Sequence, residues 1–152
     1  MSGIRVHLLL VGALLATLLG CGNEFGPMGS IAGKLTLDGK PPAADTKVIF
    51  MQSTQGYTGF GMTDAEGNYR IEWRRSGTTY DGLPVGQYDV MLVPANAIDI
   101  DAVSAEDMLA GGPKKVTGKV DIPAKFLRTT TSGLSFAVVE GENQIDIEAR
   151  SK

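Results

Sequence analysis

The chain has 152 residues, of which 14 are Lys or Arg and 17 are Asp or Glu, giving a formal net charge of −3 at pH 7. No excess of basic side chains marks a nucleic-acid-binding surface, so we expect no nucleic-acid partner. With 20 glycines and one cysteine, the composition indicates one turn-rich domain without an internal disulfide bond.

The first 20 residues have a charged start and a short apolar core. Arg5 supplies the positive charge, and an apolar run over residues 8–19 follows it. This run is shorter than the roughly 20 residues that a membrane-spanning helix needs. A positive start, a short apolar core and small residues at its end are typical of a secretory signal peptide. We therefore predict that residues 1–20 are a signal peptide, which is removed from the mature protein.

The single cysteine, Cys21, directly follows this apolar run. The sequence Leu18-Leu19-Gly20-Cys21 resembles the bacterial lipobox, in which cleavage precedes the cysteine and the cysteine thiol is joined to diacylglycerol. The resemblance implies a lipoprotein whose membrane anchor is the acylated Cys21. Two or more acyl chains anchor a protein stably, whereas one binds only marginally. The alternative is an unpaired, reactive cysteine just past an ordinary signal-peptidase site.

The residues after Cys21 indicate where the mature protein is located. In the lipoproteins that this motif resembles, an aspartate at the next position favours retention in the inner membrane, but this chain has Gly22. We therefore expect the mature protein in the bacterial cell envelope, lipid-anchored at the outer membrane. Residues 21–30 are rich in glycine and lack periodicity, so we expect them to form a lipidated flexible tether.

Removal of the signal peptide also removes the only histidine, His7. The mature chain then has no imidazole, and lipidation leaves it no free thiol. Ser-His and Cys-His catalysis and His- or Cys-ligated zinc sites are therefore excluded. We predict that the protein is not an enzyme and that it has no catalytic, cofactor or metal site.

Several short segments of the mature chain alternate apolar and polar residues, the pattern of half-buried strands. They are residues 31–37, 47–52, 57–63, 68–74 and 86–94, followed by 134–138 and 145–147 as the two arms of a hairpin. The 47–52 segment is apolar on both faces and is expected at the centre of a sheet. The 57–63 segment contains two glycines and is expected at an edge. In 68–74, Tyr69, Ile71 and Trp73 share one face.

A long segment, residues 95–121, lacks strand alternation. A capping-box pattern at residues 104–107 predicts a short helix within it. Long loops on compact domains often carry function, so we expect residues 95–121 to form a contact surface. Its candidate binding residues are Asp99, Asp101, Lys114 and Lys115. The alternative is a crossover connection without a binding role.

Short strands separated by turn residues predict an all-β fold, an antiparallel sandwich with one long inserted loop. Three motifs then carry a family resemblance. They are Asp38-Gly39-Lys40-Pro41, Thr63-Asp64 with Gly67 and Tyr69, and Pro84 with Gly86, Tyr88 and Val90. In this order they are similar to the carboxypeptidase regulatory-like domain, which implies a seven-stranded, transthyretin-like sandwich over residues 31–150. In that family the module is non-catalytic, so the resemblance supplies no catalytic residues.

Residues 64–67, Asp-Ala-Glu-Gly, either close a hairpin turn or begin a calcium loop. A calcium ion takes about six to eight oxygen ligands, and the residues that follow Gly67 supply few. We therefore predict a turn in which Asp64 binds its own backbone and Gly67 takes a positive φ.

The aromatic residues are the remaining candidates for a binding surface. Trp73 shares the face of Ile71, so we expect it in the core. Tyr57 and Tyr80 lie near loops and are the candidate surface residues for a sugar ring or a protein partner.

Together these inferences predict a lipid-anchored, exported β-sandwich with a structural or protein-interaction role in the cell envelope. Its expected partners are the membrane, through the anchor at Cys21, and an envelope protein or polysaccharide. The alternative is an accessory lipoprotein that binds carbohydrate or peptide through the long loop and an exposed strand edge.

Overall fold

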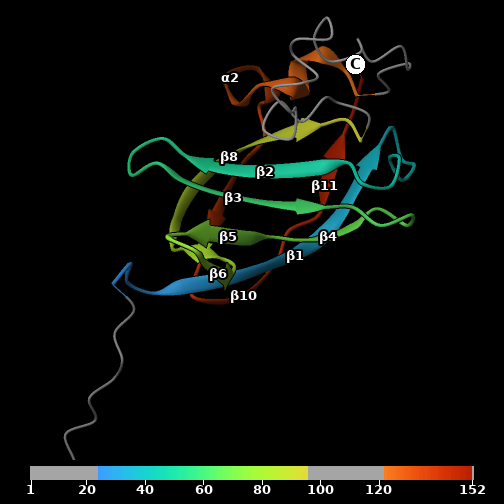
Figure 1. Ribbon diagram of the computed structural model, residues 1–152. Helices are drawn as coiled ribbons and strands as arrows, with labels where there is room; N and C mark the ends of the chain where they lie inside the picture. Colours follow the sequence, from blue (N-terminus) through green and yellow to red (C-terminus); the bar gives the residue numbers. More distant parts are fainter. Residues whose placement is uncertain (1–23, 96–121, 152) are drawn as a thin grey trace, which may run out of the picture.

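The computed structural model describes residues 24–95 and 122–151, and within them two β-sheets enclose an apolar core (Figure 1). The first sheet consists of β1 (Met28–Leu37), β4 (Asn68–Arg70), β7 (Leu83–Pro84), β10 (Gly141–Gln144) and β11 (Ile147–Ala149). The second has the order β6 (Thr78–Asp81), β5 (Glu72–Arg75), β3 (Tyr57–Met62), β2 (Lys47–Gln52), β8 (Gly86–Val93) and β9 (Ser135–Val138). The prediction of an all-β fold with two sheets is confirmed.

The described residues form eleven strands, so the predicted count of seven is wrong. Three of the additional strands, β6, β7 and β10, lie in segments where no strand was predicted, and the fourth arises because a single alternating segment serves both sheets. The 68–74 segment pairs with β1 as β4 and then, after Ile71, with β3 and β6 as β5. Strands that change sheets at a bend are a known way of closing the corners of a sandwich. Periodicity gives the face on which a side chain lies, and it does not give the neighbouring strand.

The first sheet is mixed, so the predicted antiparallel arrangement is confirmed only in part. Strand β1 is antiparallel to β4 and β7, and it is parallel to both β10 and β11. The register runs from Gly29 opposite Gly141 to Leu37 opposite Ala149. The first and last strands of the domain therefore lie side by side.

The predicted hairpin of residues 134–138 with 145–147 does not form. Strand β9 pairs with β8 in the second sheet, whereas β10 and β11 pair with β1 in the first. The side chain of Asn143 stabilises the corner between them. Its Oδ1 accepts from the Val139 N–H at 2.9 Å, and its Nδ2 donates to the Val139 carbonyl at 2.9 Å and to the Ser30 carbonyl at 3.1 Å. In the predicted hairpin, the Val139 N–H and carbonyl would pair with the backbone of the opposite arm. Here the Asn143 side chain satisfies both groups instead.

The core contains side chains from both sheets, and the expected alternation along 68–74 is confirmed. Tyr69, Ile71 and Trp73 are buried, while the residues between them are exposed. The largest fully buried side chains outside this segment include Phe50, Tyr88, Ile31, Leu35, Leu83, Leu92 and Ile147. Each such apolar side chain contributes about 1.5–3 kcal/mol relative to an exposed position.

Strand β3 lies between β2 and β5, so its predicted edge position is wrong. Its two glycines are explained by close approach of the strand that changes sheets. A Cβ at Gly61 would collide with the Arg70 carbonyl oxygen, and one at Gly59 would lie 2.8 Å from a methyl carbon of Ile71. Strand β2 is central, as predicted.

A 3₁₀ turn, η2 (Ala124–Leu127), and a short helix, α2 (Thr129–Ser132), lie beside β8 (Figure 1). No sequence pattern predicted them. Phe126 is 4 % exposed and belongs to the core, as does Ile122. The chain therefore contributes to the core before it reaches β9.

One hydrogen bond crosses β1 and joins β4 to the segment between β10 and β11. The Tyr69 hydroxyl, on β4, crosses β1 at Gly33 and donates to the carbonyl oxygen of Ile145 at 2.6 Å. A Cβ at Gly33 would collide with that carbonyl and would lie 3.1 Å from the tyrosine hydroxyl. Burial, reinforced by the negative charge of Asp146, raises the pKa of Tyr69 well above its usual range, so the hydroxyl remains a donor.

We expect Tyr69→Phe to lower the free energy of unfolding of the mature chain by about 1–3 kcal/mol, because the buried Ile145 carbonyl loses this donor. Urea titration followed by tryptophan fluorescence measures the loss. Tyr80→Phe is the matched control, since it removes a hydroxyl from a half-buried ring and should cost about 0.5 kcal/mol or less. Equal losses in the two variants would contradict the assigned role of the Tyr69 hydroxyl.

Candidate functional site

Four aromatic side chains gather at the end of the sandwich where β1 begins. This aromatic cluster consists of Phe25, Tyr57, Trp73 and Tyr80. The Trp73 ring lies at its centre, with centroid distances of 4.8 Å to Phe25, 5.2 Å to Tyr57 and 5.1 Å to Tyr80. Such edge-on and tilted pairs stabilise a fold beyond the area they bury. The cluster links β3, β5 and β6 to the residues that precede β1.

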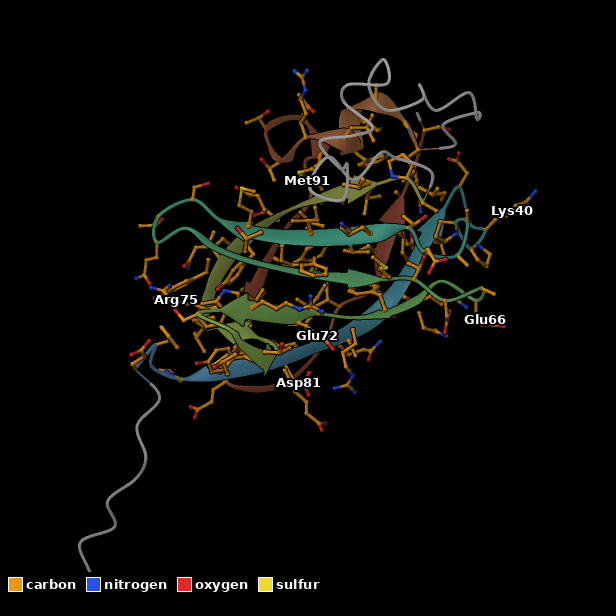
Figure 2. The ribbon with its side chains drawn as sticks, in the orientation of Figure 1. Lys40, Glu66, Glu72, Arg75, Asp81 and Met91 are labelled. Atoms are coloured by element: carbon orange, nitrogen blue, oxygen red, sulfur yellow. The ribbon has the colours of Figure 1, made fainter. Side chains whose placement is uncertain are left out.

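Arg75 covers the aromatic cluster. Its guanidinium carbon lies 5.0 Å from the centroid of Phe25, 5.8 Å from that of Trp73 and 5.9 Å from that of Tyr57. At these distances the guanidinium makes cation–π interactions with the ring faces, and Arg is the side chain that most often does so. Figure 2 shows Arg75 at the same end of the sandwich as the start of β1.

The cluster brings together Tyr57 and Tyr80, the two described residues expected at a binding surface. Both are partly buried against Trp73, which is 3 % exposed and lies in the core as predicted. The sequence analysis missed Phe25 and Arg75. Phe25 is the one aromatic residue in the 21–30 segment, and this was the signal that could have identified it.

The position of Phe25 determines where the folded domain begins. Residues 21–30 were expected to be a flexible tether, but Phe25 contacts three rings and β1 starts at Met28. The Pro27 carbonyl also accepts a hydrogen bond from the Val85 N–H at 3.0 Å. The described part of the chain is therefore packed from Phe25 onward, four positions after Cys21.

At the opposite end, residues 64–67 form the predicted turn. Asp64 Oδ1 accepts from the N–H groups of Glu66 at 3.0 Å and Asn68 at 2.8 Å, and Asp64 Oδ2 accepts from Asn68 Nδ2 at 2.9 Å. Gly67 has φ 85°, and a Cβ there would collide with the Leu35 carbonyl. The Asn68 amide is the main cause that lowers the pKa of Asp64. Both carboxylate oxygens are thus engaged in holding the turn.

Asp38, at the same end, has a similar structural role. Its Oδ1 accepts from the Ser151 N–H at 2.9 Å, and this bond lowers the pKa of Asp38. A hollow of about 570 Å³ beside it is lined by Thr36, Asp38, Gly39, Glu148, Ala149 and Arg150. Within residues 24–95 and 122–151, no three His, Cys, Asp or Glu side chains are grouped so that they could hold a metal ion.

The remaining candidate residues lie outside the described part of the chain. They are Cys21, Asp99, Asp101, Lys114 and Lys115, together with the short helix expected to begin at the capping box of residues 104–107. Across the described ranges, no helix is long and apolar enough to cross a membrane.

Comparison with known proteins assigns no family. No family model matches the chain, and no curated protein matches it. Among solved structures, the Bacillus anthracis TIE protein is similar with a TM-score of 0.39 and 13% sequence identity, over 82% of this chain and 16% of that chain. The chain thus spans a small part of that protein. The likeness to the carboxypeptidase regulatory-like domain stays a prediction.

We expect the melting temperature of Asp64→Ala to lie furthest below that of the unmodified protein above pH about 5, and the gap to close as the pH falls through the lowered folded-state pKa of Asp64. The folded-state pKa of Asp64 is lowered, so its stabilisation is present above the ordinary aspartate pKa. That stabilisation is lost as the pH falls through the folded-state value. Thermal unfolding across this pH range measures the gap.

Glu66→Ala is the matched control, because it removes a carboxylate of the same turn that accepts none of these hydrogen bonds. A gap for Asp64→Ala that stays constant with pH would contradict the capping role. Added calcium should leave the melting temperature of the unmodified protein unchanged, whereas a calcium loop would give a rise that Asp64→Ala abolishes.

Proposed function

We propose that this chain is an exported lipoprotein, anchored at the bacterial outer membrane through an acylated Cys21, and that its β-sandwich is a non-enzymatic module with a structural or protein-interaction role. The observation that carries the proposal is the sequence Leu18-Leu19-Gly20-Cys21. It ends an apolar run, and Cys21 stands four positions before Phe25, the first packed side chain among the described residues.

The use of the described acidic side chains supports a non-enzymatic role. Asp64 and Asp38 accept backbone N–H groups of a turn and of the C-terminal segment. Asp146 accepts the Lys34 N–H at 2.9 Å. A general acid or base needs a carboxyl group directed at a substrate, whereas these three groups stabilise the backbone of the sandwich.

The aromatic cluster favours this role over the alternative of carbohydrate binding. A sugar platform presents an open ring face, but Trp73 is 3 % exposed and both Phe25 and Arg75 lie against it.

Strand β6, at the margin of the second sheet, is a candidate edge for the binding of a peptide strand. The rigid sandwich would then present a partner-binding edge at a fixed position relative to the membrane.

We expect Cys21→Ser to abolish incorporation of labelled palmitate, because the hydroxyl does not replace the thiol that accepts the diacylglyceryl group. The variant should accumulate as uncleaved precursor or as a form released from membranes. Metabolic labelling and membrane fractionation in a bacterium that processes lipoproteins measure both effects.

Cys21→Ser combined with Thr54→Cys is the matched control, since it restores one thiol at an exposed turn without restoring the motif. It should remain unlabelled. Palmitate uptake and membrane retention in Cys21→Ser alone would overturn the lipoprotein proposal.

A further inference from the structure

The two ends of the sandwich differ in composition. One end, which we name the anchor end, contains the start of β1, the aromatic cluster, and the turns at residues 53–56 and 76–77. Figures 1 and 2 show these segments together, with Lys40 and Glu66 at the opposite end. The two turns of the anchor end consist of uncharged residues. The opposite end has charged side chains in its turns: Asp38, Lys40, Asp45, Asp64 and Glu66.

Exposed apolar side chains are also concentrated at the anchor end. Among the described residues, the exposed large hydrophobic side chains are Met62, Val85 and Val139, at 52%, 40% and 56%. The Val85 N–H donates to the carbonyl of Pro27, which directly precedes β1. The Asn143 side-chain amide donates both to the Val139 carbonyl and to the carbonyl of Ser30, near the start of β1. Both valines therefore lie beside the start of β1. Exposed apolar groups that gather at one place indicate an interaction surface.

The length of chain before Phe25 identifies the occupant of this surface. Phe25 lies four positions after Cys21, and at about 3.3–3.6 Å per position the chain between them spans at most about 14 Å. Strand β1 has 10 residues, so the opposite end lies about 30 Å further along it at roughly 3.3 Å per residue. A lipid-anchored Cys21 thus brings the bilayer to the anchor end first.

The side chains of the anchor end suit a phospholipid headgroup layer. Tyrosine rings and arginine combine an apolar body with a polar tip, and they are favoured at membrane interfaces. Tyr57, Tyr80 and Arg75 supply such groups. Glu24 and Glu140 flank the same end and balance the arginine, so a zwitterionic headgroup fits better than an anionic one.

We propose that the anchor end, through Val85, Val139 and Arg75, rests on the zwitterionic headgroup layer of the bilayer, and that the opposite end projects away from it. This inference rests on the proposed lipidation of Cys21. It assigns the turns at residues 38–45 and 64–67 to the end that faces soluble partners.

The test measures the depth of single fluorophores on the lipidated full-length product in phosphatidylcholine vesicles that contain a headgroup-region quencher. The only native cysteine is Cys21, and its thiol is blocked by lipid, so one engineered cysteine takes the probe. Val139→Cys and Met62→Cys are matched, because both replace exposed apolar residues. We expect strong quenching at position 139 and almost none at position 62. Equal quenching, or stronger quenching at 62, would overturn the orientation.

A second comparison tests the apolar contact itself. With the probe on Thr54→Cys in the 53–56 turn, Val139→Glu should reduce quenching, because a buried carboxylate is costly at the interface. Met62→Glu, at the opposite end, should leave quenching unchanged. Unchanged quenching in Val139→Glu, with an unchanged melting temperature, would contradict the role of this valine.

Palmitate labelling of the same preparations separates the two proposals. Preparations without label would refute the lipoprotein function, and with it the basis of the orientation. Labelled preparations whose probes are quenched equally would refute the orientation alone.

Discussion

The hydrogen bond from the Tyr69 hydroxyl to the Ile145 carbonyl is the contact on which the first sheet depends. It joins β4 to the C-terminal strands across β1, and it exists because Gly33 leaves room for the ring to pass over the strand. The same tyrosine belongs to the segment that changes sheets at Ile71. A single side chain therefore fixes the spacing within one sheet next to the point where the chain enters the other.

The two ends of the sandwich are stabilised by different interactions. At the end where β1 begins, ring contacts around Trp73 and the guanidinium of Arg75 hold Phe25 in place. At the other end, the carboxylates of Asp38 and Asp64 bind backbone N–H groups. Apolar contacts depend little on pH, whereas capping by a carboxylate requires its charge. Acid should loosen the second end before the first.

The sequence predicted the faces of the strands well and their neighbours poorly. Alternation correctly placed Tyr69, Ile71 and Trp73 in the core. It could not show that Ile71 marks a change of sheet, because both halves of the segment have the same period of two. The glycines of β3 were interpreted as a sign of an edge, although they provide clearance for a crossing strand. Clearance depends on a neighbour that is distant in sequence.

The candidate surface was likewise only partly predictable. Tyr57 and Tyr80 were identified as candidate surface residues because they lie near loops. Phe25 was overlooked in a glycine-rich segment, and Arg75 lies at a position where a charged residue is expected to be solvated. Their association through rings and a guanidinium is a tertiary property that no local pattern encodes.

The parallel pairing of β1 with β10 and β11 affects the order of folding. The bond between the Lys34 N–H and Asp146 spans 112 positions of sequence, so the first sheet cannot close until nearly the whole domain has been synthesised. Closure over such a separation is slow, because chain entropy is lost before the contacts form. A chain emerging from the ribosome can pair β1 with β4 and β7 early, but it lacks the two parallel partners of β1 until residues 141–149 have been synthesised. Under the proposed export, this delay leaves the first sheet open while the precursor crosses a secretion channel that accepts unfolded chains.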